Sequence, residues 1–206
     1  MLTAAHVRLA VLALAGLAAG VLTALAVLPQ ARERLTPSPT VKTSGRALIG
    51  GPFTLTDHNG RRVTDADFRA RIMLVVFGST SNPDTVPSSL QVLSAALDKL
   101  GPQAVRFVPV LITVDPETDT PERLKTYVAR FHPRLVGLTG TPAEIARVLA
   151  DYRIRGFRTR EEPSAPAGYT IDHPLIYVMD ADGAFRTVLN SAAGADSIAA
   201  SLAKMP

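Results

Sequence analysis

The sequence predicts an α/β fold in which a central mixed sheet is flanked by helices. Residues 72–77 and 105–114 are continuous apolar runs rich in Val and Ile, a pattern typical of strands buried on both faces of a mostly parallel sheet. Between these runs, leucines recur at helical spacing from Leu90 to Leu100, which predicts a helix that connects the two strands. The chain of 206 residues has room for one domain of about 150 residues with a sizeable core.

An antiparallel hairpin is expected before and after this strand-helix-strand segment in the sequence. Apolar residues flank Asn59-Gly60, the strongest short-range signal for a hairpin closed by a type I′ turn. Residues 175–179 and 185–189, separated by a turn sequence, predict the second hairpin near the C-terminus.

Further helices are expected where a capping residue precedes proline. Thr120-Pro121 and Thr141-Pro142 each combine an N-cap threonine with a proline suited to the first turn, and Asp196 is expected to cap a final helix. Strands and helices in this order predict an α/β sandwich of thioredoxin type with an N-terminal hairpin.

The first thirty residues predict a membrane segment. Residues 9–28 contain no charged side chain, and about 20 residues are enough for a helix to span the hydrocarbon core. The small-x-small sequence Ala24-Leu25-Ala26 is also of the form that signal peptidase accepts, so a cleaved signal is the alternative.

Three segments are therefore predicted. Residues 1–30 form an N-terminal transmembrane helix or signal segment, and residues 31–45, which mix Arg, Pro, Ser and Thr without apolar periodicity, form a linker. Residues 46–206 form the globular domain.

Composition excludes several functions. The 22 Lys and Arg residues nearly balance the 18 Asp and Glu residues, and tryptophan is absent, which argues against nucleic-acid binding. The chain has no cysteine, which excludes the thiolate chemistry of peroxiredoxins and disulfide oxidoreductases. Hydrolase and phosphate-loop signatures are also absent, so no enzymatic activity is expected. The carboxylates of residues 115–119 lack the spacing of a calcium loop and are expected to accept backbone N–H groups instead.

Residues 82–87 have the outline of a Cys-x-x-x-Cys loop with a residue other than cysteine at both cysteine positions. Around this loop, several motifs occur in an order similar to that of the Sco/SenC family, copper chaperones for cytochrome c oxidase assembly. The resemblance extends over residues 48–190, and its most specific element lies at residues 113–121. The segments are Gly50-Gly51-Pro52, Asn82-Pro83-Asp84-Thr85-Val86-Pro87, Thr113-Val114-Asp115-Pro116-Glu117-Thr118-Asp119-Thr120-Pro121, Gly137-Leu138-Thr139-Gly140 and Asp172-His173.

This resemblance implies a thioredoxin-like domain that is anchored to a membrane and lies outside the cytoplasm, in the periplasm or at the outer face of the inner membrane. It also implies a copper site made by two cysteines and a distal histidine. Carried over by position, those ligands fall on Asn82, Val86 and His173, of which only His173 keeps the ligand type. Cu(I) prefers thiolates, so no cofactor is expected at this loop.

Two functions follow from the resemblance. The first is a cysteine-less binding or assembly module linked to copper-site biogenesis in cytochrome c oxidase, with an oxidase subunit or another copper-assembly protein as its partner. The alternative is weak binding or delivery of Cu(II) through His173 and an oxygen ligand from Asp84 or Asp172. His58 and His132 are expected to be surface residues in loops.

The densest cluster of positive charge lies between the helix expected after Thr141 and the C-terminal hairpin. Alternation over residues 152–155 predicts a strand with one basic face, which is either simply solvated or docks to an acidic partner. The cluster consists of Arg153, Arg155, Arg158 and Arg160.

Overall fold

The computed structural model describes residues 49–154, 157–159, 168–170 and 175–206. Arg46–Pro206 form one compact unit. The predicted anchor, residues 1–30, and the linker, residues 31–45, lie outside the described part of the chain. Among the helices that the structure does describe, none is both long enough and apolar enough to cross a membrane.

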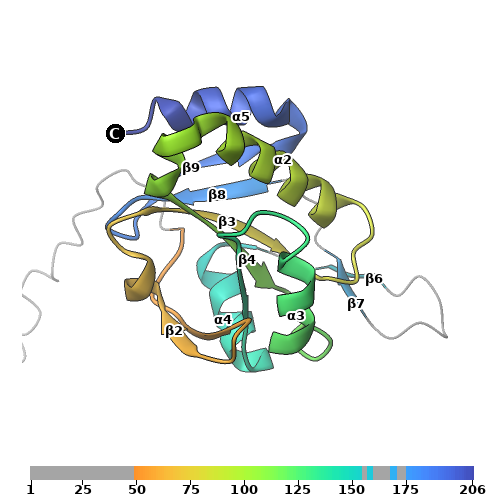
Figure 1. Ribbon diagram of the computed structural model, residues 1–206. Helices are drawn as coiled ribbons and strands as arrows, with labels where there is room; N and C mark the ends of the chain where they lie inside the picture. The colour runs from red at the N-terminus through yellow and green to blue at the C-terminus, as the bar shows by residue number, and fades with distance from the viewer. Residues whose placement is uncertain (1–48, 155–156, 160–167, 171–174) are drawn as a thin grey trace, which may run out of the picture. The chain divides into compact units, whose positions relative to one another are not determined.

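A seven-stranded mixed sheet forms the centre of the fold (Figure 1). Its strand order is β2-β1-β5-β4-β3-β8-β9, and β4 pairs in parallel with β3 and β5 while the other neighbours are antiparallel. The predicted parallel pair and both predicted hairpins are therefore confirmed. A separate antiparallel pair, β6 and β7, was not expected from the sequence. The strands are β1 (Thr54–Asp57), β2 (Arg62–Thr64), β3 (Ile72–Gly78), β4 (Phe107–Thr113), β5 (Val136–Thr139), β6 (Phe157–Thr159), β7 (Gly168–Thr170), β8 (Leu175–Met179) and β9 (Phe185–Asn190).

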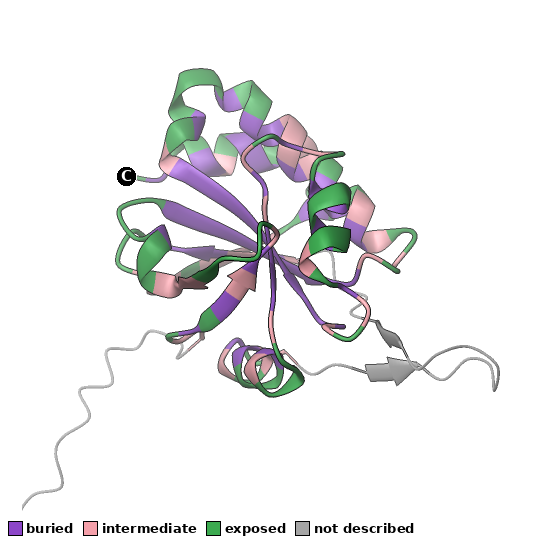
Figure 2. Cartoon of the chain, turned by 60° about the horizontal axis from the view of Figure 1, so that its bottom comes forward, coloured by how far each residue is buried: buried purple, intermediate pink, exposed green. Residues whose placement is uncertain are grey.

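Helices cover both faces of this sheet, as the predicted sandwich requires. On one face α2 and α5 pack side by side, and α3 joins the same hydrophobic core (Figure 1). On the other face α4 and the N-terminal hairpin enclose a second core. Every residue of β3 and β4 is buried between these layers (Figure 2). The helices are α2 (Thr85–Leu100), α3 (Pro121–Val128), α4 (Pro142–Asp151) and α5 (Gly194–Ala203), with short 3₁₀ turns η1 (Asp65–Phe68), η2 (Gly101–Arg106) and η3 (Ser191–Ala193).

The two predicted threonine caps are confirmed. Thr120 Oγ1 accepts the backbone N–H of Arg123 at 3.3 Å, at the start of α3. Thr141 Oγ1 accepts the N–H of Glu144 at 3.2 Å, and the Glu144 carboxylate accepts the N–H of Thr141 at 2.8 Å. This reciprocal capping box fixes the start of α4.

The turn of the first hairpin is not the predicted type I′. That type requires a positive φ at both central residues, but only Gly60 has one, at 81°. The carbonyl of Asp57 accepts the N–H of Gly60 at 2.9 Å, and the N–H of Asp57 donates to the carbonyl of Arg61 at 2.8 Å. The connection is therefore a three-residue loop. The Asp57 carboxylate favours it because it accepts the N–H groups of Asn59 and Arg61 at 2.8 and 2.9 Å.

Two predicted element starts are wrong. Asp196 lies in the first turn of α5 and pairs with Lys99 at 2.8 Å, whereas Ala193 occupies the N-cap position. The cap fails because η3 runs directly into α5. The second apolar strand begins at Phe107, since Val105 belongs to η2 and is 67% exposed.

The strand predicted over residues 152–155 is also wrong where the structure describes it. Tyr152 is the C-cap of α4, and Arg153 follows with φ 58°. The Tyr152 ring is buried, with its centroid 5.0 Å from that of Phe77 and 5.8 Å from that of Tyr177. Aromatic packing at a helix end therefore explains the apolar position that suggested a strand. The side chains of the other three arginines in the cluster lie outside the described residues.

Candidate functional site

The loop of residues 79–84 joins the C-terminal end of β3 to the N-terminus of α2. Because β3 and β4 are parallel neighbours, the loop that follows β4, residues 114–120, lies at the same edge of the sheet. The N–H of Val114 donates to the carbonyl of Gly78 at 3.3 Å and ties the two loops together. The two most specific sequence motifs therefore meet in space.

Asn82, at the first cysteine position, caps α2. Its side-chain oxygen Oδ1 accepts the backbone N–H groups of Asp84, Thr85 and Val86 at 3.1, 2.9 and 3.4 Å. In a thioredoxin-like fold these free N–H groups and the helix dipole lower the pKa of a thiol at this place. Here a neutral amide takes up the same donors, so the turn is satisfied without a charge.

Val86, at the second cysteine position, is buried in the core with 2% of its surface exposed. It packs directly on Gly78, where a β-carbon would lie only 2.2 Å from Val86 Cγ2. The last residue of β3 must therefore be glycine to accommodate this valine. The position has become part of the hydrophobic packing between β3 and α2.

Behind the loop lies a buried carboxylate whose partners the sequence did not reveal. Asp119 is completely buried. Its Oδ2 accepts the N–H of Thr80 at 3.0 Å and the hydroxyl of Thr113 at 2.5 Å, while Oδ1 accepts the hydroxyl of Thr80 at 2.5 Å. Asp119 does accept a backbone N–H, as expected, but from a residue 39 positions away. It fixes the start of the loop to the end of β4.

Arg123 on α3 extends this network to the surface. Its Nε donates to Thr80 Oγ1 at 2.7 Å and lies 3.7 Å from Asp119 Oδ1, and its Nη2 donates to Ser81 Oγ at 3.3 Å. The positive charge of the guanidinium partly compensates the buried carboxylate. Together these contacts tie the loop to α3.

The residues at the two cysteine positions do not fit Cu(I). Asn82 offers a hard amide oxygen that already accepts three N–H groups, and Val86 offers only hydrocarbon, whereas Cu(I) prefers soft sulfur ligands. Asp84 is exposed, and its side chain makes no capping hydrogen bond. Within the described residues, no three His, Asp or Glu side chains come close enough to hold a metal ion.

The structure describes two of the three histidines considered above. His173 lies outside the described residues, so its predicted place opposite the loop stays a prediction. His58 is half-buried, and its Nδ1 accepts the N–H of Gly137 at 3.0 Å. His132 is buried, contrary to the prediction of a surface residue. Its Nδ1 accepts the N–H of Arg134 at 3.1 Å. Burial lowers the pKa of His132, and the positive charge of Arg134 lowers it further.

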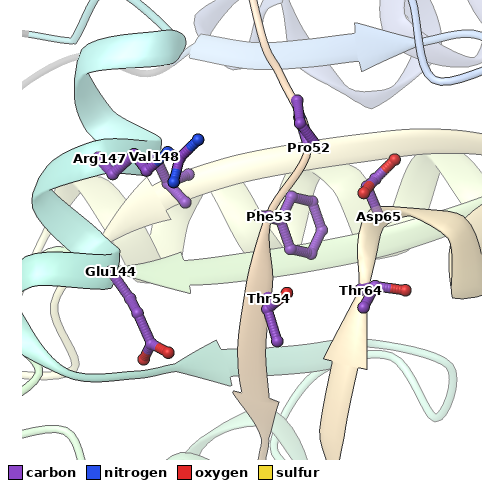
Figure 3. Close-up of a pocket in the computed structure, with 8 residues that line it drawn as sticks. All are labelled: Pro52, Phe53, Thr54, Thr64, Asp65, Glu144, Arg147 and Val148. Atoms are coloured by element: carbon purple, nitrogen blue, oxygen red, sulfur yellow. The ribbon is translucent and has the colours of Figure 1, made fainter.

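A pocket of about 380 Å³ lies on the face of the sheet that α4 covers, between α4 and the N-terminal hairpin. Glu144 and Arg147 line one side of it, Asp65 lines the other, and Phe53 lies between them (Figure 3). Both carboxylates are already engaged, because Glu144 pairs with Arg62 at 2.6 Å and Asp65 with Arg69 at 3.0 Å. The pocket offers no set of groups suited to catalysis.

The fold and the loop define the class of protein: a thioredoxin-like domain in which the helix N-terminus that usually holds reactive thiols carries an amide cap and a buried valine. The chain belongs to the SCO1/SenC family, whose profile matches residues 41–206.

Its curated relatives include mitochondrial proteins. The chain is 43% identical over 139 residues to the mitochondrial SCO1 homolog 1 of Arabidopsis thaliana, over 66% of this chain and 41% of that protein. It is 36% identical over 162 residues to the mitochondrial SCO1 homolog of Homo sapiens, over 77% of this chain and 53% of that protein. The chain therefore spans about half the length of these relatives.

Solved Sco structures share the fold. ScoI of Bradyrhizobium japonicum with copper bound matches with a TM-score of 0.68 and 43% identity, over 76% of this chain and 98% of that chain. Yeast Sco1 matches with a TM-score of 0.66 and 28% identity, over 76% of this chain and 96% of that chain. BsSco, described as a member of the Sco family of cytochrome c oxidase assembly proteins, shows the fold alone at 19% identity and a TM-score of 0.57.

Proposed function

We propose that this chain is a non-enzymatic Sco-type assembly module that takes part in copper-site biogenesis of cytochrome c oxidase by binding a partner protein. It does so without thiol chemistry, and the partner is an oxidase subunit or another copper-assembly protein. Membership of the SCO1/SenC family supports the pathway. The absence of cysteine from the sequence and the packing of the loop support the lack of a thiolate site.

The observation that carries this proposal is the way in which the two cysteine positions are used. Asn82 satisfies the N-terminus of α2, and Val86 fills the space against Gly78. A position that had only lost a ligand would leave the helix N–H groups open or a gap in the core. Here both places have structural occupants, and Asp119 holds the loop in shape from behind. A loop whose backbone is held by these contacts can serve as a contact surface without thiols.

Affinity purification of the tagged full-length chain from membranes tests the partner. We expect oxidase subunits or a copper-assembly protein to co-purify, and we expect their yield to be unchanged by a copper chelator, because the contact does not pass through the metal. A bait with residues 1–45 alone is the matched control. Absence of any such protein, or its loss on copper chelation, would contradict the proposal.

Copper titration of the domain of residues 46–206 tests the lack of a thiolate-like site. The wild-type domain should compete with a Cu(I) chelator no better than its His173→Ala variant, because neither contains the soft ligands that select Cu(I). Stoichiometric Cu(I) capture that depends on His173 would overturn this part. Cu(II) binding that is lost in both His173→Ala and Asp84→Ala would instead favour the alternative of weak Cu(II) delivery.

The location of the domain is part of the same proposal. We infer an N-terminal membrane anchor with the domain in the periplasm or at the outer face of the inner membrane, because residues 9–28 are uncharged. The full-length chain should sediment with membranes and resist extraction by high salt, since salt does not weaken the burial of apolar residues. A soluble mature form that begins near Val27 would replace the anchor by a cleaved signal.

A further inference from the structure

A second pocket, of about 320 Å³, lies at the end of the sheet opposite the 79–84 loop. The loop follows the C-terminal end of β3, whereas this pocket is lined by residues at the N-terminal ends of β4 and β5, by η1 and by the first hairpin. We call it the arginine groove, and its defining residues are Val63, Phe68, Arg71, Phe107, Arg134 and Val136. It is separate from the site of the proposed function.

The floor of the arginine groove is apolar. Phe68 is 7% exposed, and Val63 and Val136 are half-buried at its sides and pack in the same core, whereas the Phe107 side chain is buried in the core on the other face of the sheet. The side chains of Val63, Phe68 and Val136 come from β2, η1 and β5, so the sheet and the hairpin form the floor together. An apolar floor in a concave surface is the usual feature that holds the body of a small ligand.

The two carboxylates that also line the groove are already engaged. Asp57 accepts Nε and Nη2 of Arg61 at 2.9 and 2.8 Å. Asp67 accepts the N–H and the hydroxyl of Thr64 at 2.6 and 2.9 Å. Neither carboxylate makes a hydrogen bond or ion pair, among the described residues, with the two arginines that define the groove.

Arg71 and Arg134 lie just before the two strands that flank β4. Arg71 directly precedes β3, and its side chain makes no hydrogen bond or ion pair with the part of the chain that the structure describes. Arg134 lies two residues before β5, and its Nη1 donates to the carbonyls of Ala104 and Phe107 at 2.6 and 3.5 Å. Its Nε and Nη2 have no acceptor among the described residues. β3 and β5 are two strand spacings apart, about 10 Å. The side chains of Arg71 and Arg134 can therefore reach the same groove, and both line it.

We propose that the arginine groove binds a small amphipathic anion, an apolar ring or short chain that carries one carboxylate or phosphate group. The apolar body lies on Phe68 between Val63 and Val136, and the oxyanion accepts N–H groups from Arg71 and Arg134. Arginine binds both kinds of oxyanion with paired, charge-assisted hydrogen bonds.

Titration of the domain of residues 46–206 tests this proposal. The domain is one compact unit with both cores, and the Bradyrhizobium structure corresponds to it over 98% of its length, so it folds alone. The probes are 3-phenylpropionate, phenyl phosphate and, as a neutral isostere, 3-phenylpropanamide, followed by backbone amide NMR. Both anions should shift the resonances of the groove residues, and the amide should bind at least fivefold more weakly. The ratio of the dissociation constants of the two anions tells which oxyanion is preferred.

Variants identify the groups that bind. Arg71→Gln should weaken the binding of both anions by about fivefold. The domain should stay folded, because the exposed Arg71 side chain makes no hydrogen bond or ion pair with the described residues. Arg134→Lys keeps the positive charge but loses the paired N–H groups, and it should weaken the binding of both anions to a smaller extent. Arg147→Gln, at the other pocket, is the matched control and should change nothing. Equal binding of the neutral amide, unchanged affinity in Arg71→Gln, or shifts located away from the groove would each overturn the proposal.

Discussion

The contact between Gly78 and Val86 gives the sharpest test of how the loop has become part of the core. A β-carbon at Gly78 would lie 2.2 Å from Val86 Cγ2 and 3.2 Å from Cγ1, where ordinary contacts between carbon atoms are about 3.5–4.0 Å. The backbone of Gly78 does not require glycine, because its φ is not positive. Valine in a helix has one strongly preferred rotamer and cannot turn away. Gly78→Ala should therefore destabilise the domain by about 1–3 kcal/mol through overpacking.

A second substitution should relieve this clash. Val86→Ala alone removes two buried methyl groups and should cost about 2 kcal/mol, from about 0.8 kcal/mol for each group plus a small cavity. In the double variant the methyl group added at position 78 enters the space that the valine side chain leaves. The loss of stability should then be smaller than the sum of the single losses by about 1 kcal/mol or more.

Urea unfolding of the domain of residues 46–206 measures these differences, with the slope of the transition as a check that unfolding stays two-state. Gly137→Ala combined with Val86→Ala is the control, because Gly137 lies on β5 and faces Val128 and Leu124 of α3, so its effect should be additive. Additive losses in Gly78→Ala/Val86→Ala, or a neutral Gly78→Ala, would refute the packing argument.

Three further predictions concern the loop and the capping box. Asp119→Asn should lower the free energy of unfolding in urea by about 2–4 kcal/mol, because both carboxylate oxygens accept hydrogen bonds and asparagine has only one acceptor oxygen. A loss of stability below about 0.5 kcal/mol would mean that the fold does not need the network. The reduced Asn82→Cys/Val86→Cys variant should bind one Cu(I) more tightly than either single variant, with a lower affinity when His173→Ala is added; a folded double variant without this gain would show that the loop no longer has ligand geometry. The side-chain hydrogen bond from Arg62 and the N–H of Thr141 lower the pKa of Glu144 to about 2. Its contribution to stability is therefore complete above pH 4.5 and is lost as the pH falls toward 2, and an NMR titration of Arg62→Gln should show the pKa raised toward 4.5. An unchanged pKa would exclude Arg62 as the main cause.

The sequence alone determined those features that depend on neighbouring residues. Apolar periodicity located the buried strands β3 and β4 and the helix between them, because burial on one or both faces leaves a pattern with the period of the element. Thr120 and Thr141 located two helix starts, since a cap and its N–H donor are three residues apart. The loss of the thiols was also evident from the sequence.

Only the tertiary structure decided what stands in place of the thiols and which residues support the loop. Asp119 meets Thr80 across 39 positions, and Val86 meets Gly78 between a strand and a helix, so no local spacing could reveal either contact. His132 was predicted at the surface because it lies in a loop, yet packing of the surrounding elements buries it. Contacts of this kind depend on how the elements pack against each other, and packing is a property of the whole chain, whereas periodicity and capping are properties of short segments.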